Sequence, residues 1–446
     1  MKFLLEELIR AAGAEVKVNS ADLSLETMIS TDTRTIKKGD FYLPLKGESF
    51  DGEAFLDKAI NAGACGCFIT GENYPEKAQV VLKVNDTKEA YLKIANYARK
   101  KYNPKTIAIT GSSGKTTTKE MVYAVCASKF KTQKTLSNHN NEIGCCQTIL
   151  GMPEGCEVLI VEMGMRGFKE IEPLSLTAEP DIAIITNAGS AHIGRLGSLD
   201  NIAIAKCEIT AGLKNDGILI ANACERLRKF AKFEGEKLFY SINDVKILEM
   251  KAGYTKFEYK KEIYELNVEG EYNVENSLAA IEAGRCLGMS YEEIKAGLLT
   301  YKPIEKRWEV EEIRNFKVIN DSYNANPESM KASVSTFVKL YENPFVILGD
   351  MGELGENEVE IHKSVGEYLA KTVSRNVKFL TVGKLSVYIA QILENSGFAV
   401  KSFVNNKDAA LYIVENVNAG TTIFLKASRA MKFEEIISDL KGEIKL

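Results

Sequence analysis

The stretch Thr106–Thr118, TIAITGSSGKTTT, has the residue types and spacing that bind a phosphate. Its β-branched apolar residues predict a buried strand, and a helix is predicted from about Thr116 to Ser128. The two are joined by a short turn that comprises Gly111, Ser112, Ser113 and Gly114. Backbone N–H groups in such a turn point outward, and the helix dipole adds positive potential. We therefore expect a phosphate cradle with the Lys115 ammonium beside it.

The spacing of this turn differs from the general P-loop pattern. That pattern has four residues between its first glycine and Gly-Lys, whereas Gly111 and Gly114 are separated by two. The alternative interpretation is that this is an ordinary glycine-rich turn followed by a lysine and that it binds no phosphate. The strand before the turn, the helix after it and the Lys115–Thr116 pair favour phosphate binding.

The composition limits the classes of function. A chain of 446 residues is long enough for roughly three domains. The net charge of −4, without a block of like charge, argues against a nucleic-acid surface. Glu6 and Glu7 interrupt the apolar start, so we expect no signal peptide, and no run reaches the roughly 18 apolar residues of a membrane span. The nine cysteines lack zinc or disulfide spacing, which indicates buried thiols and a cytoplasmic location.

Three α/β blocks position the phosphate turn. Residues 1–103 predict a smaller N-terminal α/β domain, which ends before the helix breaker Pro104. Residues 104–302 alternate apolar strands with helices, as in a doubly wound, P-loop ATPase-like domain with a parallel sheet. Within it, residues 237–268 predict a small antiparallel addition. Residues 303–446 predict a C-terminal Rossmann-like domain.

Four polar residues of the central block fall where ligands of parallel sheets bind, beyond the carboxyl ends of the strands. Glu162 closes a predicted strand, His192 follows the next one, and Lys206 lies on the helix after that. Of these, the Thr116 hydroxyl, the Glu162 carboxylate and the His192 imidazole could hold Mg²⁺ beside a triphosphate. Taken singly, Glu162 could be a solvated carboxylate and His192 a hydrogen-bonded loop residue.

Motifs in all three blocks resemble the Mur ligases of bacterial cell-wall synthesis. They are STDTRTIKKGDFYLPLKGESFDG (30–52), TGSSGKTTTKEM (110–121), NHNNEIG (138–144), EMGMRGFKEI (162–171), NAGSAHIGRLGSLDNIAIAKCEI (187–209), PIEKRWEV (303–310), NDSYNANPESM (320–330), LGDMGELG (348–355) and KASR (426–429). SYNANP (322–327) resembles the signature of the branch that adds D-alanyl-D-alanine to UDP-N-acetylmuramoyl-tripeptide. The Asp-Asn-Pro-Arg motif of the branch that adds the third amino acid is not found.

The resemblance implies that ATP phosphorylates a carboxylate and that an amine attacks the resulting acyl phosphate. Lys115 would then lie against the β- and γ-phosphates. Thr116 and Glu162 would hold one Mg²⁺, and Glu162 would share a second with His192. Lys115, Glu162, His192 and Lys206 would form the catalytic set.

Lys206 is implied to be an N-carbamate derived from CO₂. An ammonium beside two Mg²⁺ ions would be repelled, whereas burial can lower a lysine pKa until the neutral amine takes up CO₂. The product is an oxygen ligand that Mg²⁺ prefers. The alternative is an ordinary surface lysine.

The resemblance also implies three sets of binding residues. ATP would contact Gly111, Ser112, Ser113, Gly114, Lys115, Thr116, Thr117, Asn273, Asn276, Arg307 and Asp321. The UDP substrate would contact Thr33, Glu48, Ser49, Phe50, Asn140 and Asn141. The incoming dipeptide would contact Tyr323, Asn324, Asn326, Ser428 and Arg429.

Several of these assignments have alternatives. Asn273 could be a helix cap, and Phe50 could be a core aromatic rather than a ring that stacks on uracil. Tyr272 stands where many relatives carry His, and Cys145–Cys146 where many carry a proline. His362 falls at a family-like position, with its role open.

We expect a cytoplasmic, monomeric amide ligase with two small-molecule substrates, in which closure of the third block excludes water. One alternative is another ligase on the same scaffold, such as a folylpolyglutamate synthase, which the uridine-type first block disfavours. The other is a regulator that kept only nucleotide binding. The third residue of the peptide substrate, lysine or diaminopimelate, is left open.

Overall fold

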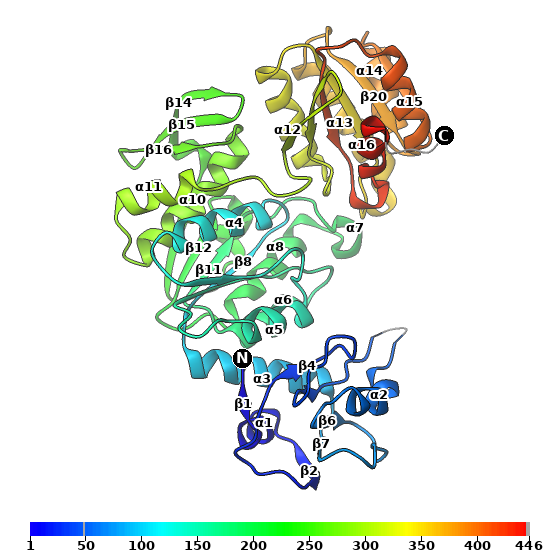
Figure 1. Cartoon of the computed structure of the whole chain (residues 1–446). Helices are drawn as coiled ribbons and strands as arrows, with labels where there is room; N and C mark the ends of the chain where they lie inside the picture. The colour runs from blue at the N-terminus through cyan, green and yellow to red at the C-terminus, as the bar shows by residue number, and fades with distance from the viewer. Residues whose placement is uncertain (48–49, 443–446) are drawn as a thin grey trace.

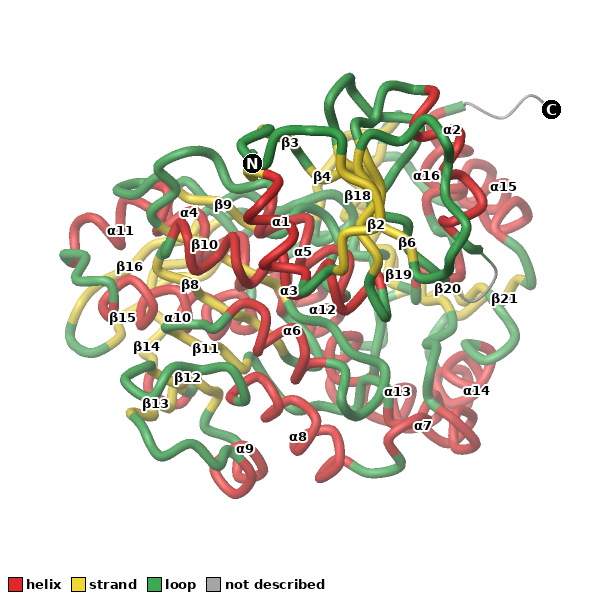
Figure 2. Tube along the Cα trace, turned by 90° about the horizontal axis from the view of Figure 1, so that it is seen from below, coloured by secondary structure: helices red, strands yellow, loops and turns green. Residues whose placement is uncertain are grey.

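Three α/β blocks follow one another along the computed structural model, which describes residues 1–47 and 50–442. The N-terminal and C-terminal blocks lie at opposite ends, with the central block between them (Figure 1). Seen from below, the N-terminal block lies in front of the other two (Figure 2). The three-domain α/β prediction is confirmed, while the predicted limits at 103 and 302 stay a prediction.

The N-terminal block contains a five-stranded sheet in the order β2-β7-β6-β5-β4. Its strands are β2 (Glu15–Asn19), β4 (Ile29–Ser30), β5 (Phe41–Tyr42), β6 (Gly66–Ile69) and β7 (Val80–Lys83), beside the pair β1 (Phe3–Leu4) and β3 (Glu26–Thr27). Its helices are α1 (Leu5–Ala12), α2 (Leu56–Asn61) and α3 (Thr87–Tyr102). α3 starts at the Asp86 cap and ends at Asn103, whose left-handed backbone comes directly before Pro104.

The central sheet is six-stranded and parallel, in the order β13-β12-β11-β8-β10-β9. Its strands are β8 (Lys105–Thr110), β9 (Thr132–Lys134), β10 (Val158–Glu162), β11 (Ile182–Ile185), β12 (Ile218–Asn222) and β13 (Glu236–Tyr240). Its helices are α4 (Lys115–Ala127), α5 (Glu142–Leu150), α6 (Ile171–Ala178), α7 (Ile193–Leu196), α8 (Leu199–Cys207), α9 (Glu225–Phe230), α10 (Glu271–Cys286) and α11 (Tyr291–Leu299).

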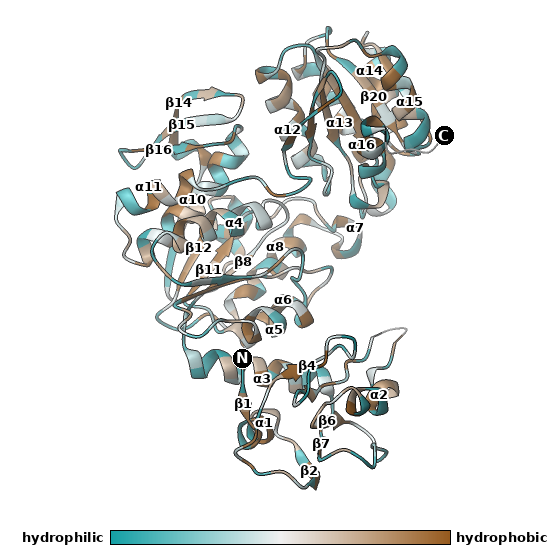
Figure 3. Ribbon diagram, viewed as in Figure 1, coloured by the Kyte–Doolittle hydropathy of each residue, from teal (hydrophilic) through white to brown (hydrophobic). Residues whose placement is uncertain are grey.

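The strands of this sheet are apolar on both faces, so each face builds its own core. Ile107, Ile109 and Ile160 point to the core under α4, α10 and α11. Their neighbours Ala108 and Leu159 point to the core under α5, α6 and α8. Apolar residues accordingly colour the central strands brown (Figure 3).

One prediction for this block is wrong in part. Residues 237–268 do not form a separate antiparallel unit throughout, because β13 pairs in parallel with β12 and extends the central sheet. Only β14 (Val245–Lys251), β15 (Tyr254–Tyr259) and β16 (Glu262–Leu266) form the antiparallel addition. The sequence pattern indicates a strand but not its partner.

The C-terminal sheet has the order β17-β18-β22-β19-β20-β21, parallel except for the edge strand β17. Its strands are β17 (Glu309–Ile313), β18 (Phe316–Asn320), β19 (Pro344–Gly349), β20 (Lys378–Val382), β21 (Val400–Phe403) and β22 (Thr422–Lys426). Its helices are α12 (Pro327–Leu340), α13 (Glu358–Thr372), α14 (Val387–Asn395), α15 (Asn406–Asn416) and α16 (Glu434–Lys441). Across residues 1–47 and 50–442, no helix is long and apolar enough to cross a membrane.

Helix α3 joins the N-terminal block to the central one, since it packs against both α5 and α6. Arg99 on this helix is only 2% exposed. Its Nη2 donates to the Glu179 carbonyl at 2.7 Å and lies 3.6 Å from the Asp181 carboxylate. Burial alone would raise the pKa of Asp181, but hydrogen bonds from Lys214 and the Thr106 N–H hold it below its usual value.

We predict that Arg99→Met lowers the free energy of unfolding by about 3 kcal/mol, because it leaves buried acceptors without their cation. Lys100→Met is the matched control. Lys100 is 56% exposed and pairs with the same Glu179, so its loss should cost under about 1 kcal/mol. Urea unfolding of both variants measures the difference, and equal effects would contradict a structural role for the buried guanidinium.

Candidate active site

The phosphate turn links β8 to α4 and requires glycine at both ends. Gly111 and Gly114 have φ of 151° and 79°, which L side chains rarely adopt. A Cβ on Gly111 would collide with Thr186 Oγ1, and one on Gly114 would collide with Asn276 Oδ1. The turn is therefore packed directly against the end of β11 and against α10.

Side chains after β11 brace the same turn. Ser112 Oγ donates to the Gly189 carbonyl at 2.8 Å. The Ser113 N–H donates to Asn187 Oδ1 at 3.0 Å, and Asn187 Nδ2 donates back to the Ser113 carbonyl at 3.0 Å. Asn187 is the first residue of the motif at 187–209, but no role was predicted for it. Its position just after a predicted strand of the parallel sheet was the sequence feature that could have indicated a role at the phosphate turn.

The Lys115 side chain folds back over this turn. Its Nζ donates to the Gly111 carbonyl at 2.8 Å. Burial lowers the pKa of Lys115, and the nearby Glu162 carboxylate opposes that shift. The ammonium thus lies beside the cradle, as predicted for a group that faces phosphates.

Glu162 is the buried carboxylate at the end of β10, with 1% exposure. Its Oε1 accepts from Thr116 Oγ1 at 3.2 Å and from Asn140 Nδ2 at 3.0 Å. Its Oε2 accepts no hydrogen bond from the residues that the structure describes, and it lies 3.6 Å from Lys119 Nζ. The structure thus brings together Thr116 and Glu162, two of the predicted metal ligands.

Lys119 was missed by the sequence analysis. It is fully buried, and its Nζ lies 3.2 Å from Glu120 Oε1, whose other oxygen pairs with Lys134. Lys119 follows Lys115 by four residues, so both lie on one face of α4. This four-residue spacing was the sequence feature that could have placed Lys119 near the site.

Lys206 on α8 is fully buried, and its Nζ has no hydrogen-bond partner in the part of the chain that the structure describes. Burial, reinforced by the Lys115 charge, places the pKa of Lys206 well below its usual value. The surface-lysine alternative is therefore wrong. A buried neutral amine fits carbamate formation, because CO₂ reacts with the unprotonated form.

His192 precedes α7 in a left-handed conformation, with φ of 64°. Its Nδ1 lies 2.5 Å from Glu353 Oε2 of the C-terminal block. The contact with His192 is the main cause that lowers the pKa of Glu353, against the opposing effect of burial. Glu353 was missed because it comes from another domain.

The predicted nucleotide residues of α10 lie against the phosphate turn. Asn276 Oδ1 accepts from Thr118 Oγ1 at 3.3 Å and lies beside Gly114. Asn273 Nδ2 donates to the Glu269 carbonyl at 2.7 Å, whereas the N-cap of α10 is Gly270, so the capping alternative for Asn273 is wrong. Thr117 follows Thr116 in the first turn of α4.

Arg307 lies at the entrance to the C-terminal block. Its guanidinium is 3.9 Å from the centre of the Tyr323 ring, and that of Arg429 is 5.3 Å from the same ring. Asp321 accepts from Lys426 Nζ at 2.6 Å and from Ser333 Oγ at 2.9 Å. Predicted nucleotide and dipeptide residues therefore share one face, with the missed Lys426 buried beneath it.

Three further predicted residues have structural partners. Asn326 caps α12 through Ser329 N–H, and Asn141 caps α5 through Gly144 N–H. The Ser428 N–H donates to the Asp350 carbonyl at 3.0 Å. Asn324 is exposed.

In the N-terminal block, Thr33 lies between β4 and β5. Phe50 is 53% exposed and stacks on Phe55 at a ring distance of 5.4 Å, so the core-aromatic alternative is wrong. Glu48 and Ser49 lie outside the described residues.

His362 has a structural position. Its Nε2 accepts from the Met351 N–H at 3.0 Å, and its Nδ1 lies 2.7 Å from the Glu358 carbonyl. Burial lowers the pKa of His362, which favours the neutral ring that this pattern requires. The side chain thereby fixes the loop after β19.

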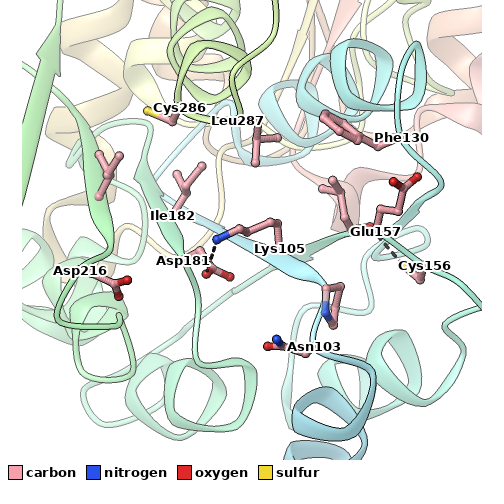
Figure 4. A pocket seen from close by; sticks show the side chains of 13 residues that line it. Asn103, Lys105, Phe130, Cys156, Glu157, Asp181, Ile182, Asp216, Cys286 and Leu287 are labelled. Carbon is pink, nitrogen blue, oxygen red and sulfur yellow. Dashed lines mark hydrogen bonds and ion pairs between the residues drawn. The ribbon is translucent and has the colours of Figure 1, made fainter.

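A surface pocket lies at the opposite, amino edge of the central sheet (Figure 4). Lys105 and Asp181 line it and pair with each other at 3.4 Å. Since ligands of open α/β sheets bind beyond the carboxyl ends of the strands, we do not assign the reaction to this pocket.

The donor set fits Mg²⁺ bound together with a nucleotide. Within the described ranges, no cluster of three or more His, Cys, Asp or Glu could hold a metal alone. Mg²⁺ commonly takes one or two carboxylates and completes its shell with water and phosphate. The Thr116 hydroxyl and Glu162 Oε2, the carboxylate oxygen not used in the hydrogen bond with Thr116, match that pattern.

Two domain profiles match the chain. The Mur ligase middle domain matches residues 109–284, and the Mur ligase glutamate ligase domain matches residues 306–429. The chain belongs to the Mur ligase family.

Within the family, one relative is the UDP-N-acetylmuramoyl-tripeptide–D-alanyl-D-alanine ligase of Bacillus subtilis. It is 37% identical over 92% of both chains. A crystal structure of MurF from Acinetobacter baumannii is 27% identical, with a TM-score of 0.89 over 99% of both chains. MurF from Thermotoga maritima in complex with ADP is 26% identical, with a TM-score of 0.82 over 94% of this chain and 97% of that one.

We predict that Gly114→Ala weakens ADP binding at least about 10-fold, because the new Cβ collides with Asn276 and distorts the turn. Gly155→Ala is the control. Gly155 also has a positive φ, of 70°, but a Cβ there meets nothing within 4 Å. Both variants carry the left-handed strain of about 1–2 kcal/mol. Calorimetric titration with ADP would contradict the packing argument if both variants bound alike.

Proposed function

We propose that the protein is an ATP-dependent ligase that joins D-alanyl-D-alanine to UDP-N-acetylmuramoyl-tripeptide, in cytoplasmic synthesis of peptidoglycan precursors. The full-length similarity to ligases of that name supports the choice of substrates. The observation that carries the chemistry is the contact of Thr116 with the buried Glu162 at the end of the phosphate turn.

The reaction requires activation of the substrate carboxylate, whose carbon is a poor electrophile. A carboxylate oxygen attacks the γ-phosphorus of ATP, ADP leaves, and an acyl phosphate forms. The amine of D-alanyl-D-alanine then attacks the carbonyl carbon. The C–O bond breaks, inorganic phosphate leaves, and the amine loses a proton as the amide forms.

The residues of the central block have distinct roles in this proposal. Lys115 and the N–H groups of the turn hold the phosphates as charge moves from ATP to the carboxylate. Thr116 and Glu162 would hold one Mg²⁺, and His192 with a carbamate on Lys206 would complete a second site. The cations supply charge neutralisation between the two reacting anions.

The binding residues divide between the blocks. Thr33 and Phe50 would contact the UDP part, and Asn140 would face the muramoyl part while it holds Glu162. Arg307 and Asp321 would contact the nucleotide. Tyr323 and Arg429 would face the dipeptide, whose carboxylate suits the Arg429 guanidinium beside that ring.

The decisive experiment measures phosphate release with ATP, Mg²⁺, UDP-N-acetylmuramoyl-tripeptide and D-alanyl-D-alanine, each omitted in turn. We expect turnover only with all four. Turnover with L-glutamate in place of the dipeptide would favour a folylpolyglutamate synthase activity. No release with the complete set would favour a nucleotide-binding regulator.

We predict that Lys206→Ala lowers the rate at least about 100-fold and that a short carboxylic acid such as acetate restores part of it. The acid can supply the oxygen ligand that the carbamate provides. Lys229→Ala, at an exposed lysine on α9, should keep the rate and show no response to acetate. Full unaided activity of Lys206→Ala would exclude the carbamate.

A further inference from the structure

The loop between β11 and α8 contacts both the phosphate turn and the C-terminal block. At its start, Gly189 accepts the hydrogen bond from Ser112 of the turn. At its centre it carries His192. A movement of this loop would therefore reach the phosphate turn and a proposed metal ligand together.

The C-terminal block binds this loop through two carboxylates. Glu328, in the first turn of α12, accepts from Ser190 Oγ at 2.7 Å and from Ser190 N–H at 3.3 Å. Glu353 pairs with His192 Nδ1 at 2.5 Å, and its carbonyl accepts from Gly194 N–H at 3.3 Å.

The two segments meet backbone to backbone next to the contact between Glu353 and His192. A Cβ on Gly194 would collide with the Gly355 nitrogen, and one on Gly355 would lie 2.6 Å from Gly194 Cα. Such an approach tolerates only glycine at both positions, so Glu353 and His192 meet within a closely fitted contact. Figure 1 shows α7 as the part of the central block that reaches toward the C-terminal block.

The loop that presents Glu353 is held rigidly by its own domain. The Asp350 carboxylate accepts the N–H groups of Lys384, Leu385 and Ser386. The Met351 N–H donates to His362 Nε2. The Glu353 carboxylate therefore moves with the whole C-terminal domain.

We propose that Glu353 is a positioning residue for His192: it takes one ring nitrogen and leaves the other for metal, so that docking of the C-terminal block completes the second metal site. The inference rests on the metal role given to His192 in the proposed function. A histidine that binds metal almost always has its second ring nitrogen held by a carboxylate, a carbonyl or water. Here that carboxylate comes from another domain.

The structure allows a contrary outcome, which the experiment separates. Glu353 could instead occupy the place of a substrate anion, since Arg195 and Arg166 add positive charge around it. Removal of its charge would then increase turnover. A positioning role requires the opposite.

The first measurement counts metal ions. Mn²⁺ binding is followed by electron paramagnetic resonance on the full chain, with a non-hydrolysable ATP analogue and UDP-N-acetylmuramoyl-tripeptide. We expect two sites in the unmodified protein. In Glu353→Gln one site keeps its affinity and the other weakens at least about 10-fold. Glu353→Asp, which keeps the charge on a shorter side chain, should lie between the two.

Glu356→Gln is the matched control, because Glu356 is an exposed carboxylate of the same loop. It should keep both Mn²⁺ sites. Unchanged Mn²⁺ affinity in Glu353→Gln, an equal loss in Glu356→Gln, or faster turnover of Glu353→Gln would each overturn the proposal. Glu353→Asp decides the matter if the glutamine variant does not fold.

A second measurement tests whether Glu353 acts through His192. In a His192→Ala background, Glu353→Gln should change the remaining Mn²⁺ affinity and the rate by less than about 2-fold. Additive effects would overturn the proposal, as would two intact sites in His192→Ala. Failure of D-alanyl-D-alanine to trigger turnover would instead refute the proposed function, while the Mn²⁺ count would still decide the role of Glu353.

Discussion

The buried carboxylate of Glu162 is the interaction on which the rest of the site depends. It joins Thr116 of the phosphate helix to Asn140 of the loop before α5, and it faces Lys119. A buried anion without compensating groups would be strongly destabilising, so these neighbours make its position possible. Among the described residues, none donates a hydrogen bond to its second oxygen, which leaves that oxygen able to accept a cation.

Much of this arrangement could be predicted from the sequence because it is local or follows from sheet topology. The phosphate turn is a contiguous segment, and Glu162 and His192 follow strands whose ends must meet at one edge. Buried strands of the central block are apolar throughout, so their positions were also predictable. The order of the strands was not, as the parallel pairing of β13 shows.

The residues that the sequence did not reveal act through tertiary contacts. Lys119 and Lys426 resemble surface lysines in sequence, yet each is buried against a carboxylate. Glu353 meets His192 only because two domains dock, and no local pattern encodes that contact. The sequence left the role of His362 open, and in the structure both of its ring nitrogens contact the backbone.

The joint formed by α3 has a consequence for the order of events on the protein. Apolar residues of the N-terminal block and of one face of the central block form a single continuous core, whereas the C-terminal block has cores of its own. The first two blocks therefore present a preorganised surface. Binding of a ligand that spans both blocks costs the protein little conformational entropy. In the proposed reaction that entropic cost would fall on a later step, closure of the C-terminal block, so binding of the first substrate and commitment to reaction would be separate thermodynamic events.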